Sequence, residues 1–117
     1  MKDWKQFYAD KLVTEEYYIT IPTQYDIFTF NVRYVRRNGY TLILPVVMDI
    51  TQVSDFGKLF IDWFKIRSDF NTRYDAPHWW KKIRFNRKQK IVSWAVSSID
   101  TAYSEFKKEM IDKTINQ

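Results

Sequence analysis

A stretch of thirteen residues combines cations with aromatic rings, and its residue types suit binding chemistry better than any other part of the chain. It reads His78-Trp79-Trp80-Lys81-Lys82-Ile83-Arg84-Phe85-Asn86-Arg87-Lys88-Gln89-Lys90. Single-stranded nucleic acid needs both components, because cations neutralise phosphates and flat rings stack on unpaired bases. The stretch therefore indicates a nucleic-acid surface, with burial of Trp79 or Trp80 in a core as the alternative.

The excess charge of the chain is concentrated around this stretch. Residues 76–99 contain six bases and no acid, which leaves thirteen bases against fourteen acids elsewhere. A second window without acids, residues 27–48, holds Arg33, Arg36 and Arg37. This distribution is typical of a protein that binds polyanions, and a solvated basic loop is the competing interpretation.

We expect the cations of both windows to contact phosphates of single-stranded RNA, and one tryptophan to stack on a base. The candidate residues are Arg33, Arg36, Arg37, Trp79, Trp80, Lys81, Lys82, Arg84, Arg87, Lys88 and Lys90. Duplex DNA is disfavoured because none of the three helices predicted below carries a dense basic face.

Patterns for catalysis and metal binding are weak by comparison. The chain has no Cys, one His and two Gly, which excludes thiol nucleophiles, His-rich metal centres and Gly-rich phosphate loops. Asp62 and Asp69 read as surface carboxylates, and the Glu105-Phe106-Lys107 run falls on a predicted helix rather than on a nuclease strand. We predict no enzymatic activity, cofactor or metal. The enzymatic alternative is a metal-independent ribonuclease toxin that uses His78 as an acid or base.

Length and composition predict a single α+β domain. The chain has 117 residues, 45% of them hydrophobic and 19% aromatic, enough for one core. No signal peptide or membrane-spanning run is visible, so we expect a cytoplasmic protein without a membrane partner. The oligomeric state is not predicted.

The strands are predicted from alternation and turn residues. Asp3 and Gln6 fit a capping box for a helix that ends near Val13, and residues 17–21 form a strand. Asn38-Gly39 predicts a two-residue hairpin with Arg37 opposite Tyr40. Its core face then holds Phe28, Phe30, Val32, Tyr34, Ile43, Pro45 and Val47. The opposite face is half apolar and should be partly covered; it holds Asn31, Arg33, Val35, Arg37, Leu42, Leu44 and Val46. Pro45 requires a bulge or a sheet edge.

Two further helices follow from apolar spacing. The first begins at Thr51 or Ser54 and has a stripe of Val53, Phe56, Leu59, Phe60, Trp63, Phe64 and Phe70. Residues 71–77 read as a loop, and residues 83–85 and 90–96 as two short strands, with a helix through the region as the competing interpretation. The pattern Ser97-x-x-Asp100 predicts the start of the last helix. Its inner face would hold Ile99, Ala102, Tyr103, Phe106 and Met110.

In size, in its Lys/Tyr/Phe/Ile-rich composition and in its mixed α+β order, the chain resembles the PrgU family, small regulators of Gram-positive enterococcal pheromone-responsive conjugative plasmids. The resemblance implies a partly open, PUA-like barrel and RNA binding that restrains production of a conjugation adhesin after transcription. It assigns no site residues. A different alternative from the residues themselves is a protein-interaction module of a mobile element that inhibits a host factor, because the hairpin's second face and the Tyr/Trp content suit an interface.

Overall fold

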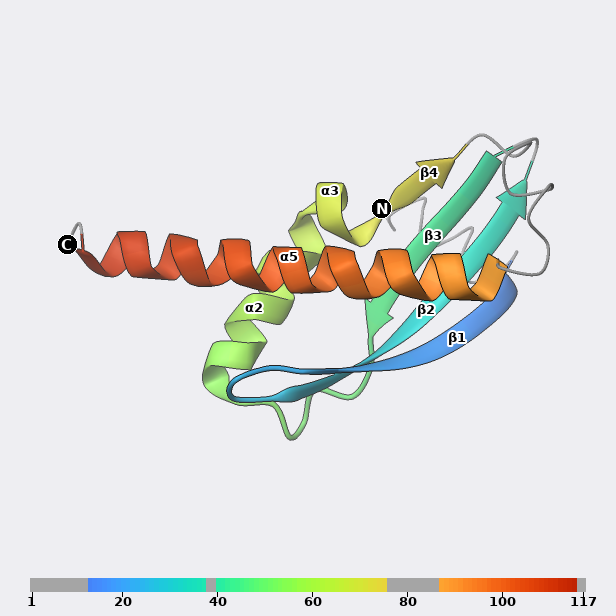
Figure 1. The fold of residues 1–117 in the computed structure, drawn as a ribbon. Helices are drawn as coiled ribbons and strands as arrows, with labels where there is room; N and C mark the ends of the chain where they lie inside the picture. The colour runs from blue at the N-terminus through green and yellow to red at the C-terminus, as the bar shows by residue number, and fades with distance from the viewer. Residues whose placement is uncertain (1–12, 38–39, 76–86, 116–117) are drawn as a thin grey trace, which may run out of the picture.

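An antiparallel sheet of four strands forms one layer of the protein, and the helices pack against it (Figure 1). The computed structural model describes residues 13–37, 40–75 and 87–115. In sheet order the strands are β1 (Val13–Pro22), β2 (Ile27–Arg37), β3 (Tyr40–Val47) and β4 (Arg73–Asp75). The predicted α+β class is thus confirmed, with β1 and β4 at the two edges of the described sheet. The PUA-like barrel stays a prediction.

The predicted hairpin is confirmed in its register. Arg37 pairs with Tyr40, and pairing continues without a shift to Phe30 opposite Val47. The predicted core face is buried, with Val47 only partly so. The strand predicted over residues 17–21 is confirmed and extends in both directions as β1, which pairs with β2. Alternating apolar residues and the Asn-Gly pattern were therefore sufficient to predict the register at the centre of the sheet.

Pro45 lies opposite Val32, and the β2–β3 register has no bulge there. Counting outward from Arg37 and Tyr40, which flank the turn, places the backbone nitrogen of Pro45 on the side away from β2. The next strand, β4, pairs only with Thr41, Leu42 and Ile43. Beyond Ile43, no described strand pairs with this side of β3, so the proline nitrogen lies at an edge of the described sheet, which is one of the two predicted options.

The second face of the hairpin is also covered. Val35, Leu42 and Leu44 are buried and form a small cluster with Val46. This cluster is separate from the main core, because side chains alternate between the two faces of a strand. The expected partial coverage of this face is confirmed.

Helix α2 (Asp55–Ile66) begins after Ser54, the second of the two predicted start residues, and α3 (Ser68–Asn71) follows at once. The Ser54 hydroxyl accepts a hydrogen bond from the Gly57 backbone N–H at 3.0 Å. Ser54 also donates from its N–H and its hydroxyl to the buried Asp26 carboxylate, at 2.8 and 2.5 Å. This contact ties the β1–β2 turn to the start of α2.

Two parts of the predicted α2 stripe are wrong. Leu59 is exposed, and Phe70 belongs to α3, after the break at Arg67. The loop predicted over residues 71–77 is also wrong in part, because residues 73–75 form β4. A strand of three residues lacks enough alternation for its pattern to stand out in the sequence.

Helix α5 (Arg87–Ile115) overturns the strand predicted over residues 90–96 and confirms the competing helix. The start predicted at Ser97 and Asp100 is wrong too, since both are exposed residues within the helix. Ile91, Ala95 and Ile99 are completely buried at helical spacing, so packing against the sheet selects the helix. The predicted inner face from Ile99 to Met110 is confirmed.

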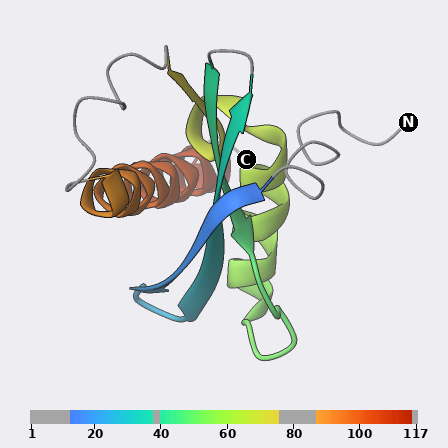
Figure 2. The ribbon, with the colours of Figure 1, turned by 90° about the vertical axis from the view of Figure 1, so that its right-hand side faces the viewer.

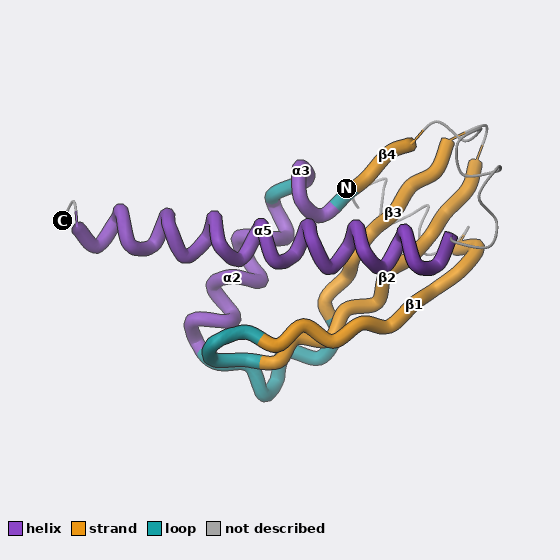
Figure 3. Tube along the Cα trace, in the orientation of Figure 1, coloured by secondary structure: helices purple, strands orange, loops and turns teal. Residues whose placement is uncertain are grey.

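The long helix crosses one side of the sheet, and its C-terminal half extends beyond the strands, past α2 (Figure 1, Figure 3). Seen nearly along its axis, α5 lies on one side of the strands (Figure 2). With 29 residues, it is about 43 Å long at 1.5 Å per residue. The helix predicted to end near Val13 and the strand predicted over residues 83–85 lie outside the described residues.

Candidate nucleic-acid interface

The charges on α5 divide the helix into two unlike halves. Residues 87–99, called the basic half below, carry three bases and no acid. Residues 100–115 carry three bases and four acids. Arg87, Lys88 and Lys90 therefore lie together at the N-terminal end, where the helix dipole is positive. The three positive charges and the positive end of the helix dipole both favour an anion at this end of α5.

An arginine from the edge strand lies beside an aromatic ring of the basic half. The guanidinium carbon of Arg73 on β4 is 5.8 Å from the centre of the Trp94 ring. Both side chains are half-buried, so the pair is partly open to solvent. Arginine and tryptophan planes are both surfaces on which an unpaired base can stack.

A second cation–aromatic pair lies toward the opposite sheet edge. The Lys88 ammonium nitrogen is 5.6 Å from the centre of the Tyr17 ring on β1. Lys88 is exposed, while Tyr17 is half-buried and its hydroxyl donates to Glu15. The basic half of α5 thus has a cation–aromatic pair toward each edge strand, β1 and β4.

The structure separates the predicted site residues into three groups. Arg87, Lys88 and Lys90 lie at the start of α5. Arg33 lies on the other sheet face, where its Nε donates to the Asn31 side-chain oxygen at 2.8 Å. Arg36 and Arg37 are at the end of β2 beside the hairpin turn. Trp79, Trp80, Lys81, Lys82, Arg84 and His78 lie outside the described residues.

Sequence reasoning missed Arg73, Trp94 and Tyr17 as parts of this surface. Arg73 fell in a predicted loop, and Trp94 in a predicted strand. The helical spacing of Ile91, Ala95, Ile99 and Ala102 is the signal that would have placed Trp94 on a helix. It also removes the argument against duplex DNA, because the basic residues at 87–90 do lie on a helix.

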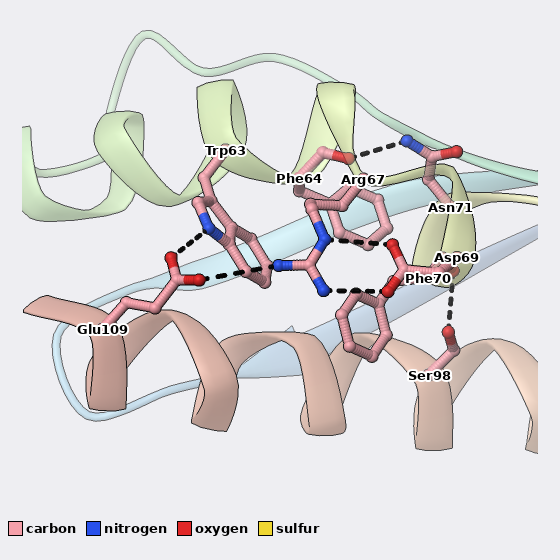
Figure 4. Close-up of polar contacts among 8 residues, drawn as sticks. All are labelled: Trp63, Phe64, Arg67, Asp69, Phe70, Asn71, Ser98 and Glu109. Carbon is pink, nitrogen blue, oxygen red and sulfur yellow. Dashed lines mark hydrogen bonds and ion pairs between the residues drawn. The ribbon is translucent and has the colours of Figure 1, made fainter.

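A polar joint among α2, α3 and α5 fixes the position of the long helix (Figure 4). The Trp63 indole N–H donates to the Glu109 carboxylate at 2.6 Å. The Ser98 hydroxyl donates to the Phe70 carbonyl at 2.7 Å, close to the basic half. These bonds join α5 to α2 and α3 at two points eleven residues apart on the helix, so rotation of α5 would break both.

Arg67 lies at the centre of this joint. Its guanidinium carbon is 4.5 Å from the Trp63 ring centre and 4.9 Å from that of Phe70 (Figure 4). It donates two hydrogen bonds to Asp69, at 3.0 and 2.8 Å. These bonds lower the pKa of Asp69 and raise the pKa of Arg67. Asp69 is thus an ion-pair partner within the joint.

The described residues contain no cluster of three or more His, Cys, Asp or Glu side chains that could hold a metal ion. Asp62 is exposed on α2, and Glu105 and Lys107 are on α5 rather than on a strand. None of these side chains forms a catalytic arrangement with another in the described part of the chain.

Comparison of the chain with protein-family models, with curated proteins and with solved structures finds no match in any of the three. Among the described helices, none has the length and apolar character needed to cross a membrane. The functional argument therefore depends on the charges and contacts of the chain itself.

Proposed function

We propose that this protein is a non-enzymatic regulator that binds single-stranded RNA through the basic half of α5 and the cation–aromatic pairs on either side of it. The observation that carries the proposal is the meeting of an acid-free helix N-terminus with two such pairs. Arg87, Lys88 and Lys90 would contact phosphates, and Trp94 or Tyr17 would offer a stacking surface.

The first turn of α5 supports this proposal because its charges oppose the helix dipole. Acids normally occupy this position, since each cation at a helix N-terminus costs about 0.3–1 kcal/mol at the surface. The first turn of α5 has no acid and begins Arg87-Lys88. Bound phosphates would relieve this repulsion.

The position of the two pairs favours a flexible strand over a duplex. Lys88 with Tyr17 lies toward β1, and Arg73 with Trp94 lies toward β4, so a ligand that touches both must curve across α5. A single strand can follow that curve, whereas duplex DNA stays nearly straight over about 50 nm. Half-buried aromatic rings can also stack on the unpaired bases of a single strand, whereas the bases of a duplex are already stacked on one another.

The test is binding of the purified chain to labelled single-stranded RNA of random sequence and to duplex DNA. If about five cations contact phosphates, the slope of log K against log salt is near −3.5, and affinity falls roughly a hundredfold between about 50 and 200 mM salt. We expect this dependence together with a preference for RNA. Absence of binding to RNA at low salt would reject the proposal, and a preference for duplex DNA would reject the single-strand assignment.

A matched pair of variants locates the site on α5. Lys88→Gln with Lys90→Gln removes two cations from the basic half, while Lys108→Gln with Lys113→Gln removes two exposed cations from the other half. The first pair should reduce the salt slope by about 1.4, at about 0.7 per cation. The second should leave the slope unchanged. Equal effects of both pairs would mean that RNA responds only to net charge.

Post-transcriptional control on a conjugative plasmid, in a Gram-positive cytoplasm, is the biological setting that the resemblance to PrgU-type regulators implies. We propose it as the role in which such RNA binding acts. Crosslinking the protein to RNA in cells and sequencing the bound RNA would test it. Recovery of a conjugation transcript is the expected result, and recovery of RNA without enrichment of any transcript would contradict this role.

A further inference from the structure

A groove of about 570 Å³ lies at the opposite end of α5 from the basic half. Three segments line it: the β1–β2 turn, the start of α2 and the C-terminal turns of α5. The lining residues are Gln24, Tyr25, Ser54, Phe56, Lys107, Met110, Ile111 and Thr114. Its volume is within the range of about 300–1,000 Å³ that is typical of small-molecule sites.

The lining of this groove is mainly apolar, and the groove is open to solvent. Tyr25 of the β1–β2 turn is 61% exposed, and Ile111 of α5 is 58% exposed. The Tyr25 ring packs edge-on against Phe56 at 5.7 Å between ring centres, so the tyrosine is held at the rim. Isolated exposed apolar residues are ordinary, but several that converge on one concave surface indicate a ligand site.

Lys107 gives the groove its charge. Its ammonium nitrogen is 5.1 Å from the centre of the buried Tyr103 ring, and the side chain is half-buried. No carboxylate in the described part of the chain forms an ion pair with it, and the groove lining contains no acid. A half-buried ammonium group at an apolar surface is most stable beside one negative charge.

We propose that this groove binds a small amphipathic carboxylate, with its apolar part against Phe56, Met110 and Ile111 and its carboxylate at Lys107. One ammonium group matches one negative charge, which favours a carboxylate over a doubly charged phosphate. The Gln24 side-chain amide adds a hydrogen-bond donor at the rim. This site is separate from the proposed RNA surface, and its test requires no RNA.

The experiment uses decanoate and decanol, which share an alkyl chain but differ in charge. Decanoate is kept below its micelle concentration and decanol below its solubility limit. Binding is followed by NMR through the methyl shifts of Met110 and Ile111. We expect saturable shifts with decanoate at about tenfold or more higher affinity than with decanol, the size of one charge-assisted hydrogen bond. Lys107→Gln should reduce this preference to about twofold or less.

A second pair of variants separates the groove from general surface hydrophobicity. Ile111→Asp places a carboxylate in the groove at an exposed position, and Leu59→Asp makes the same kind of change on α2, outside the groove, where Leu59 is 54% exposed. We expect at least a tenfold loss of decanoate affinity for the first variant and no loss for the second. The proposal is overturned if decanoate causes no saturable shift, if Lys107→Gln keeps the preference for decanoate, or if both aspartate variants behave alike.

Discussion

Reversing the two charges at the start of α5, by Arg87→Glu with Lys88→Glu, should make the protein more stable while it weakens RNA binding. The reason is the helix dipole, which is unfavourable to cations and favourable to acids at this end. The first turn of α5 contains no acid. If these side chains bind RNA at a cost to folding, reversing their charges raises stability and lowers RNA affinity. If they are merely solvated, RNA affinity does not fall.

The size of the stability change follows from the helix dipole and from the contact of Lys88 with Tyr17. Each reversal removes an unfavourable interaction of a cation with the helix dipole and adds a favourable interaction of a carboxylate. Together these raise the free energy of unfolding by about 0.6 kcal/mol per residue at the lower limit of the dipole range. Loss of the Lys88–Tyr17 contact offsets about 0.5 kcal/mol, as an exposed cation–π pair. The two reversals together add about 1.2 kcal/mol at that limit, so the net gain in the free energy of unfolding is about 0.7 kcal/mol. For 117 residues, that raises Tm by about 3 °C.

Thermal unfolding followed by circular dichroism measures this change in the absence of RNA. Lys108→Glu with Lys113→Glu is the matched control. It changes the net charge by the same amount, but the two residues lie in the C-terminal half of α5, and Lys113 lies in its last turn. That control should lower Tm, since cations favour a helix C-terminus. High salt should diminish both shifts, because at about 1 M the screening length is near 3 Å.

RNA affinity is the second measurement on the same proteins. Arg87→Glu with Lys88→Glu should bind single-stranded RNA at least tenfold more weakly at about 50 mM salt, as expected from the loss of two phosphate contacts. Tm shifts of the same sign in both double variants would refute the dipole argument. Unchanged RNA affinity in a folded Arg87→Glu/Lys88→Glu protein would refute the site assignment.

Three further predictions concern the packing that holds α5 and the sheet together. Gly57→Ala should lower the free energy of unfolding by about 1–3 kcal/mol, measured by chemical denaturation, because the added methyl group would clash with Asp26 and Val53. Lys58→Ala is the neutral control, and an equal denaturation midpoint for the two variants would refute the clash. Trp63→Phe should lower the free energy of unfolding by about 1–2 kcal/mol, because it keeps an aromatic ring but loses the N–H hydrogen bond to Glu109. The same substitution should cause a smaller loss in a protein that already carries Glu109→Gln. Asp69→Asn should lower Tm slightly at neutral pH, since the pair with Arg67 is largely exposed. Because the folded-state pKa of Asp69 is lowered, the difference from the wild type should persist above about pH 4 and close as pH falls through that lowered pKa; a difference constant down to pH 2 would contradict the ion pair.

Local patterns in the sequence were sufficient for the centre of the sheet and the start of α2. The Asn38-Gly39 pattern predicted the hairpin register, alternation assigned Phe28 and Phe30 to the core, and Ser54 was one of the two predicted helix starts. These features depend on residues close together in the chain, whose turn, pleat and capping preferences act before tertiary contacts form. The charge excess in residues 76–99 was likewise a property of composition.

Only tertiary packing decided the form of the basic half of α5. Val92, Trp94 and Val96 alternate as in a strand, while Ile91, Ala95 and Ile99 recur as in a helix, so both periods fit the same residues. Burial of the second set against the sheet selects the helix and directs Trp94 toward Arg73, twenty-one positions earlier in the chain. Lys88 meets Tyr17 for the same reason. Such pairs depend on how α5 crosses the sheet, and local propensities contain no information about that crossing.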